Sequence, residues 1–391
     1  MPPRMSIPVS TKSSTRSVVT KTGGIYIHVP FCQSRCIYCD FYSTTYGAEW
    51  KRSYVDSLKR EIQLRREEID AARVPSLYIG GGTPSQLPST LLQEVFRAIQ
   101  ENFTLAKDAE VTIEANPDDV TPEWLAALSQ TPVNRISMGV QTFSDSLLCF
   151  LNRRHTSHQA IEAVQRCQDA GYSNISLDLI YGLPGQTFED WCRDVKLLLS
   201  LDVPHLSAYA LSYEEDTALS KMLQDGKVDE ASDELSWQMY EYLMNETAAA
   251  GMEHYEISNF AKPGMHSRHN SSYWDGSPYL GLGPGAHSFD GGCVRRSNDT
   301  SLKDYVCSTA DVPHQKEVLT PEEQYDELVM TRLRTALGLS LSLLTPEQRS
   351  YCMEMAEPHI HRGDLVQEGL VLRLSRKGIF ISNSIISDLM C

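Results

Sequence analysis

Short apolar runs rich in β-branched residues recur along the first two thirds of the chain. Most of them end in glycine or in polar residues. Runs that are apolar throughout are typical of strands buried on both faces of a parallel sheet. The predicted strands are Ile25–Val29, Leu77–Ile79, Val111–Ile113, Ile136–Val140, Ile175–Ile180 and Leu206–Leu211, with a seventh at His254–Ile257.

Stretches with helical periodicity lie between these strands. They are Glu49–Ala71, Thr90–Ile99, Thr156–Ala170 and Phe188–Leu199. Repeated alternation of strand and helix is the pattern of βα units around a parallel sheet. In parallel α/β barrels the ligand site lies at the carboxyl ends of the strands, where this chain carries polar and glycine residues. We therefore predict an α/β fold, a partial (β/α)6 TIM-type barrel, in preference to a doubly wound open sheet.

The last part of the chain predicts a separate small domain. Segment 291–318 is rich in polar residues, has little periodicity and predicts a linker. Thr320 and Thr345 each stand before Pro-Glu in a helix-capping pattern, the first helix running to about residue 336. Runs Leu370–Leu374 and Ile379–Ile381 suggest a hairpin. The expected divisions are a tail at 1–22, a barrel at 23–290, the linker, and an α+β helical or winged domain at 319–391.

Charge and the N-terminal segment narrow the function classes. The 391 residues include 51 Asp and Glu against 35 Lys and Arg, a net charge of −16, which disfavours nucleic-acid binding by bulk charge. No apolar run approaches the roughly 18 residues of a membrane span. Residues 1–22 are basic, rich in Ser and Thr and free of acid, as in a mitochondrial presequence. The alternative for this segment is a solvated tail.

Three cysteines directly follow the first predicted strand. Cys32, Cys36 and Cys39 have C-x3-C-x2-C spacing, and Gly80–Gly82 follow the second strand. Three thiolates can each bind one iron of a four-iron cube, which leaves the fourth iron open to an amine and a carboxylate such as the methionyl part of S-adenosylmethionine (SAM). A zinc site with a distant fourth ligand and a redox-active thiol loop are the alternatives. The combined pattern favours the open cluster.

These patterns resemble the radical SAM superfamily, and closely the haem chaperone branch of the oxygen-independent coproporphyrinogen III oxidase-like proteins. The resemblance covers about residues 24–391. It implies that residues 23–290 form a radical SAM barrel with a haem-binding extension. The matching stretches are Ile25–Cys32, Gly80–Ser85, Glu114–Pro117, Ser137–Gln141, Gly182–Thr187, Tyr255–Phe260 and Tyr279–Ala286.

The resemblance also implies the cofactors: a [4Fe-4S] cluster held by three cysteines plus SAM, SAM itself, and haem. Glycine lets the backbone approach a ligand closely, a carboxylate can meet an amine or a ribose hydroxyl, and an arginine fork suits a carboxylate. No residue is assigned a catalytic role. The implied SAM-binding residues are Tyr26, Tyr38, Gly81, Gly82, Thr83, Glu114, Gln141, Arg153 and Asp178.

The segment His269–Trp274 carries the His-Asn-x-x-Tyr-Trp pattern associated with the haem chaperone branch. An imidazole can be an axial ligand of haem iron, and aromatic rings can form flat apolar walls. The resemblance thus implies haem ligation by His269. The alternative is a packed loop in which this histidine makes ordinary hydrogen bonds. His254, His266 and His287 are competing candidates.

One departure from the oxidases bears on activity. Phe41 stands where they carry a further cysteine, and a phenyl ring cannot replace a thiol. We therefore expect a mitochondrial haem chaperone that delivers haem to acceptor apoproteins, respiratory ones included, and lacks coproporphyrinogen oxidase activity. Peripheral membrane association and a homodimer are compatible with this role. The alternatives are a radical SAM enzyme that generates a 5′-deoxyadenosyl radical for oxygen-independent porphyrinogen oxidation, and a degenerate fold that serves as an interaction module.

Overall fold

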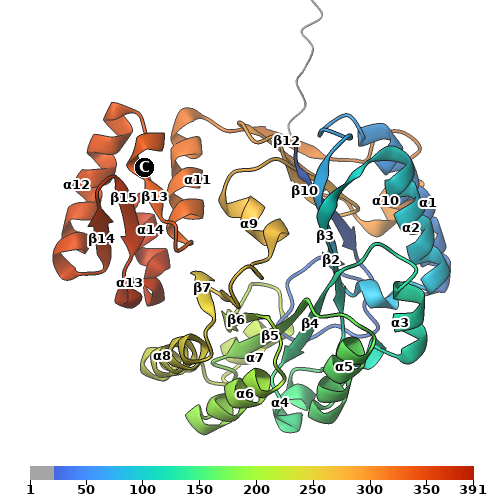
Figure 1. Cartoon of the computed structure of the whole chain (residues 1–391), viewed down its shortest axis with the longest axis horizontal. Helices are drawn as coiled ribbons and strands as arrows, with labels where there is room; N and C mark the ends of the chain where they lie inside the picture. The colour runs from blue at the N-terminus through green and yellow to red at the C-terminus, as the bar shows by residue number, and fades with distance from the viewer. Residues whose placement is uncertain (1–21) are drawn as a thin grey trace, which may run out of the picture.

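A computed structural model describes residues 22–391 of the chain, so nearly all of the predicted presequence lies outside the described residues. Figure 1 shows a curved sheet with helices on its outer side and a second, smaller body formed by the C-terminal segment. Within the described part, no helix combines the length and apolar character needed to cross a membrane.

Six parallel strands form the centre of the sheet in the order of the sequence. Each is hydrogen-bonded in parallel to the next. This order confirms the partial barrel, because a doubly wound sheet reverses its strand order part-way. The strands are β1 (Gly24–Val29), β2 (Val74–Gly81), β3 (Leu105–Ala115), β4 (Arg135–Gln141), β5 (Ile175–Tyr181) and β6 (His205–Ala210).

Helices cover the outer side of these strands (Figure 1). In the first of them, Tyr54, Leu58 and Ile62 recur on one face and are fully buried, so burial of that face fixes the helix on the sheet. This helix ends at Arg65, earlier than its predicted end at Ala71. The helices are α1 (Ala48–Arg65), α2 (Ser89–Asn102), α3 (Pro122–Leu128), α4 (Asp145–Phe150), α5 (Ser157–Asp169), α6 (Phe188–Ser200), α7 (Ala218–Gln224) and α8 (Asp233–Ala249), with 3-10 turns η1 (Pro84–Gln86) and η2 (Pro117–Asp119).

Shorter strands extend the sheet at both edges. β9 (Tyr279–Leu282) pairs with β1, and β10 (His287–Phe289), β11 (Val294–Ser297) and β12 (Gln315–Val318) follow antiparallel. At the other edge lie β8 (Asn259–Ala261) and β7 (Glu253–Glu256), which is the predicted seventh strand. The helix α9 (Arg268–Trp274) lies between β8 and β9 in the sequence.

The predicted linker 291–318 is wrong. This segment contains β11, α10 (Leu302–Cys307) and β12, all joined to the barrel. No side chain of β11 is fully buried and those of β12 are exposed, so they leave no apolar pattern in the sequence. Backbone pairing of β11 with β10 and of β12 with β11 holds them instead, together with an ion pair between Arg296 and Asp311 at 2.7 Å.

The C-terminal residues form a domain with its own apolar core. Capping boxes at Thr320 and Thr345 begin two of its helices, as predicted. The predicted hairpin is wrong, because residues 371–374 pair antiparallel with the preceding residues 365–368 and not with 379–381. Ser375 accepts a hydrogen bond from the Gly378 N–H at 3.0 Å and so starts a helix where the turn was expected. The elements are α11 (Pro321–Leu333), β13 (Leu339–Ser340), η3 (Leu341–Leu343), α12 (Pro346–Arg362), β14 (Leu365–Glu368), β15 (Val371–Leu374), α13 (Arg376–Phe380) and α14 (Ser382–Leu389).

Candidate functional site

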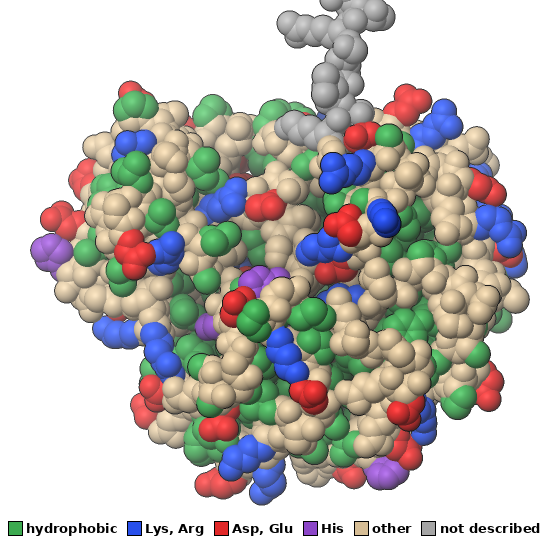
Figure 2. Space-filling view, viewed as in Figure 1, with side chains coloured by type: hydrophobic (Ala, Val, Ile, Leu, Met, Phe, Trp, Pro, Cys, Tyr) green, Lys and Arg blue, Asp and Glu red, His purple; other side chains and the backbone are tan. Residues whose placement is uncertain are grey.

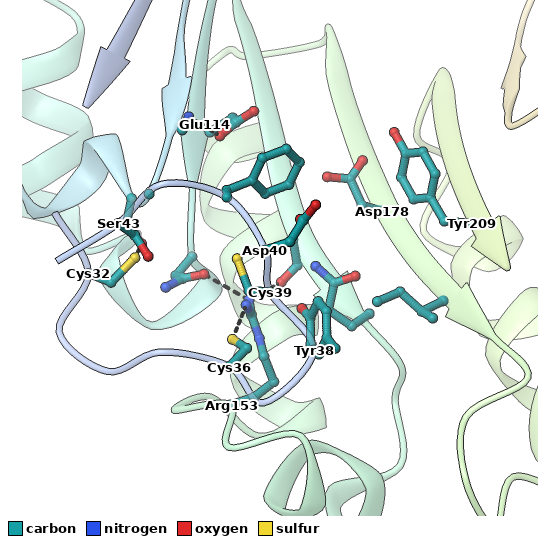
Figure 3. Close-up of a pocket in the computed structure, with 18 of the residues that line it drawn as sticks. Cys32, Cys36, Tyr38, Cys39, Asp40, Ser43, Glu114, Arg153, Asp178 and Tyr209 are labelled. Carbon is teal, nitrogen blue, oxygen red and sulfur yellow. Dashed lines mark hydrogen bonds between the residues drawn. The ribbon is translucent and has the colours of Figure 1, made fainter. Parts of the chain in front are cut away.

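A cavity of about 450 Å³ opens at the carboxyl ends of the parallel strands, where barrels of this kind place their ligands. Residues from β2, β3, β4, β5 and β6 line it together with the loop that follows β1 (Figure 3). The structure brings most of the predicted site residues together here. They are Cys32, Cys36, Tyr38, Cys39, Gly81, Gly82, Thr83, Glu114, Gln141, Arg153 and Asp178.

The cysteine loop is folded back onto its own start. The Cys32 N–H donates to the Thr44 carbonyl at 2.9 Å, and the Thr44 N–H donates to the Pro30 carbonyl at 2.7 Å. All three cysteines face the cavity, and burial raises the pKa of the Cys39 thiol to about 11, with the neighbouring thiols adding to the shift.

Hydrogen-bond donors approach two of the three sulfurs. The Thr83 hydroxyl lies 3.5 Å from Cys32 Sγ. The Arg153 guanidinium lies 3.4 Å from Cys36 Sγ, as Figure 3 shows. Such donors stabilise thiolates. Within residues 22–391 no group of three or more His, Cys, Asp or Glu is arranged around a single metal-ion position. In an iron–sulfur cluster each thiolate binds a different iron, so sulfurs that share a cavity with nearby donors fit such a cluster.

Two carboxylates face the cavity, Glu114 near the end of β3 and Asp178 in the middle of β5. Glu114 Oε1 accepts from the Tyr78 hydroxyl at 2.8 Å, and Oε2 accepts from the Gly81 N–H at 3.0 Å. Burial, together with the smaller effect of Asp178, raises the pKa of Glu114 to about 7 against the opposing hydrogen bond from Tyr78. Burial likewise raises the pKa of Asp178 to about 6. A cation in this cavity would favour the ionised form of both groups.

The residues that surround Gly81 and Gly82 leave no room for a side chain at either position. Gly81 has φ +112°, and a Cβ there would lie 2.6 Å from the His28 ring. A Cβ on Gly82 would lie 3.0 Å from the backbone of Phe31. The absence of side chains therefore lets β2 pack against β1 and the start of the cysteine loop, while both glycines still border the cavity.

Arg153 is bound by the protein itself. One terminal nitrogen donates to the Asn116 side-chain oxygen at 2.8 Å and to the Gly139 carbonyl, and the other faces Cys36. Arg153 also lines the cavity, and its predicted interaction with a ligand carboxylate stays a prediction. The guanidinium ties the cysteine loop to β4.

The structure does not bring Tyr26 or His269 to the cavity wall. The Tyr26 hydroxyl hydrogen-bonds His28 Nδ1 at 3.1 Å. His269 is 1% exposed, and its two ring nitrogens hydrogen-bond the hydroxyls of Ser76 and Tyr273, both at 2.9 Å. In this arrangement both ring nitrogens of His269 have partners within the protein, and haem ligation by this residue stays a prediction.

Comparison with known proteins bears on the family. Residues 26–198 match the family described as the Radical SAM superfamily. Heme chaperone HemW of Lactococcus lactis is 38% identical over 323 residues, which are 82% of this chain and 84% of the relative. The chain belongs to the HemW family of radical SAM proteins. The mitochondrial radical S-adenosyl methionine domain-containing protein 1 of Bos taurus is 30% identical over 391 residues, 95% of this chain and 88% of the relative.

Solved structures extend the likeness of this HemW-family protein to its fold. Coproporphyrinogen III oxidase (HemN) from Escherichia coli has a TM-score of 0.82 and 22% identity, and the match covers 95% of this chain and 90% of that chain. At this identity the likeness concerns the fold alone. It agrees with the α/β barrel described above.

Several other residues line the cavity of this HemW-family protein without having been predicted as site residues. Alternation along the strands could have identified some of them, because Asp178 is paired with Gly139 on β4 and with Ser207 on β6. The next residue on that face of β6 is Tyr209 (Figure 3). The unpredicted residues include Ser34, Arg35, Asp40, Ser43, Tyr78, Asn116, Ser137, Ser207, Tyr209 and Asn270.

The raised pKa of Glu114 predicts a pH-dependent stability for the cluster-free protein. A carboxyl that binds its proton more tightly when folded stabilises the fold at low pH, and this contribution is lost as the pH rises from about 4.5 to about 7. We expect Glu114→Gln to remove a decline on the order of 2 kcal/mol. Melting temperatures at pH 5 and pH 7.5 would measure it. An equal decline in the wild type and the variant would contradict the prediction.

Proposed function

We propose that this protein is a haem-binding chaperone that carries a SAM-ligated [4Fe-4S] cluster and delivers haem to acceptor proteins. The observation that carries the proposal is that three cysteines of one loop share a cavity with Glu114 and Asp178. Its relatives across most of the chain include proteins named heme chaperones. Their names support the haem role, and the cavity supports the cluster and SAM.

The residues that line the cavity indicate which group each part of it would bind. Cys32, Cys36 and Cys39 would hold the cluster, and the carboxylates of Glu114 and Asp178 would face a cationic ligand such as SAM. Together the bound cluster and SAM supply one-electron chemistry. The chain itself would hold such a ligand in the cavity at the strand ends.

Location and partners follow as further parts of the proposal. The acid-free segment 1–22 and the mitochondrial relative of Bos taurus support a transit peptide and a mitochondrial location. Apoproteins of the respiratory chain are acceptors that would be found in that location, and a peripheral contact with the membrane would bring the protein close to them. A homodimer is a further part of the proposal. Figure 2 shows acidic and basic side chains interspersed over one face of the molecule, and with a net charge of −16 we expect no nucleic-acid partner.

A radical SAM enzyme acting on a porphyrinogen is the second candidate. The cavity beside the cysteine loop extends to Tyr209 and Asp178, which leaves space for a substrate. Against it stands Phe41, which is 64% exposed at the cavity where the oxidases carry a cysteine. The chaperone is therefore the preferred function.

Anaerobic reconstitution followed by haem titration tests the proposal. We expect about four irons and four sulfides per chain, a Soret band from bound haem, transfer of that haem to an acceptor apoprotein, and no turnover of coproporphyrinogen. Decarboxylation of coproporphyrinogen with release of 5′-deoxyadenosine would favour the enzyme instead. Stoichiometric zinc without iron or sulfide would rule out the cluster altogether.

A further inference from the structure

The segment that carries His269 forms the short helix α9, and the protein holds this helix at both ends. At its start the Glu110 carboxylate accepts from the backbone N–H groups of Arg268 and His269, both at 2.9 Å. At its end the Trp274 ring lies under the Arg334 guanidinium of the C-terminal domain, 5.0 Å from the ring centre. The helix is therefore fixed against the barrel on one side and the C-terminal domain on the other.

The imidazole of His269 is enclosed within the barrel. Ser76 on β2 and Tyr273 on α9 bind its two nitrogens. On the β1 side, a Cβ at Gly24 would lie 2.6 Å from Ser76 Oγ and 3.1 Å from His269 Nδ1. Position 24 thus accepts only glycine without movement of these side chains, which indicates that the imidazole is closely packed.

The ring of His269 packs against the ring of Tyr78. Their centres lie 5.2 Å apart at an interplanar angle of 28°, a stacked arrangement. The Tyr26 ring stacks at a similar angle on the same imidazole, with centres 6.5 Å apart. Tyr78 in turn donates its hydroxyl to Glu114 at the cavity. One line of contacts therefore runs from α9 through His269 and Tyr78 to the cavity wall.

The charge near His269 fits this arrangement. Burial and the nearby Arg135 guanidinium lower the pKa of His269 to about 3, so the imidazole is neutral at physiological pH. A neutral imidazole has one donor and one acceptor nitrogen, and the two hydroxyls that face it can act in either role. The histidine thus satisfies both partners without an ion.

We propose that His269 is a positioning residue that holds the Tyr78 hydroxyl against Glu114, rather than an axial ligand of haem. The proposal rests on the proposed function, because SAM binding at Glu114 and haem binding are both part of it. It also gives the His-Asn-x-x-Tyr-Trp segment a role at the SAM cavity, which Asn270 of the same segment lines directly.

Three variants test the proposal: His269→Ala, Tyr78→Phe and the double variant. Tyr78→Phe removes only the hydroxyl and keeps the ring, so it remains informative if the alanine variant folds poorly. We expect each single variant to weaken SAM binding to the reconstituted protein by roughly tenfold, measured by calorimetry. The double variant should be no weaker than either single one, because both act through the same contact. The affinity for haem and the position of the Soret band should stay unchanged.

A pH profile separates positioning from a general loss of structure. The Tyr78 hydrogen bond lowers the pKa of Glu114, so its loss should move the midpoint of SAM binding to higher pH in both single variants. Asp178 and Arg135, the other charged groups facing Glu114, are unchanged in them. His158→Ala, at a side chain that is 80% exposed, is the matched control and should behave as the wild type.

The opposite pattern would overturn the proposal. It consists of a Soret band that shifts or disappears in His269→Ala while SAM affinity and its pH midpoint stay at the wild-type values. Failure of the proposed function has a different signature, since the wild type would then bind neither SAM nor haem after reconstitution. The two failures are therefore distinguishable in one set of titrations.

Discussion

The Cys36→Ser variant is expected to lose the iron–sulfur cluster, from about four irons per chain in the reconstituted wild type to nearly none. A serine hydroxyl stays protonated near neutral pH and is a poor ligand for iron, so one corner of the cube would lose its attachment. Cys36 is also the thiol bound by Arg153, which connects the loop to Asn116 and β4. Its replacement removes both the ligand and that contact.

Iron and sulfide analysis, together with the visible absorption of the anaerobic protein, measures this loss. Cys149→Ser is the control, because Cys149 is an exposed thiol on α4 that does not line the cavity. It should retain the full cluster. Full iron content in Cys36→Ser would show that this thiol is not a ligand and would leave only two cysteines in the loop for the role.

The barrel could be predicted from the sequence because its strands are buried on both faces. β1 and β5 are almost wholly buried, so their apolar runs are visible without any tertiary information. β11 and β12 could not be predicted, since their exposed and half-buried side chains carry no such pattern. These strands form because the edge of β10 is available for pairing, and the position of that edge depends on the tertiary structure.

The candidate site divides in a similar way. The cysteine loop is local in sequence, so its spacing alone predicted that its thiols act together. The positions of the Tyr26 and His269 side chains depend on tertiary packing and not on the local sequence pattern alone. Tyr26 is paired with Tyr78, yet its hydroxyl hydrogen-bonds His28 and its ring stacks on His269, contacts that the sequence does not reveal. The orientation of His269 depends on the packing of α9 against Ser76, 193 positions away in the chain.

A buried network around the carboxylate of Glu61 connects α1 to the segments that extend the sheet beyond β1. This network also could not be predicted from the sequence. Glu61, 1% exposed, forms an ion pair with Arg65 at 2.8 Å on the same helix. It also accepts hydrogen bonds from the Asn298 side chain at 2.7 Å and from the Gly283 N–H and the Tyr305 hydroxyl, both at 2.8 Å. One side chain thus connects α1 to α10 and to the segments that follow β9 and β11.

Glu61→Ala should therefore destabilise the protein strongly, by about 3–5 kcal/mol, because it leaves three buried donors without their acceptor and removes one of the two carboxylates that pair with the buried Arg65, the other being Glu68. Thermal and urea unfolding of the cluster-free protein would measure the loss. Glu94→Ala is the matched control, since Glu94 pairs with Arg52 and Lys59 at the surface, where water replaces the lost partner and only a small change is expected. Equal losses in the two variants would mean that burial of the network adds nothing, and that pairing of the strands alone holds β9 and α10 against the barrel.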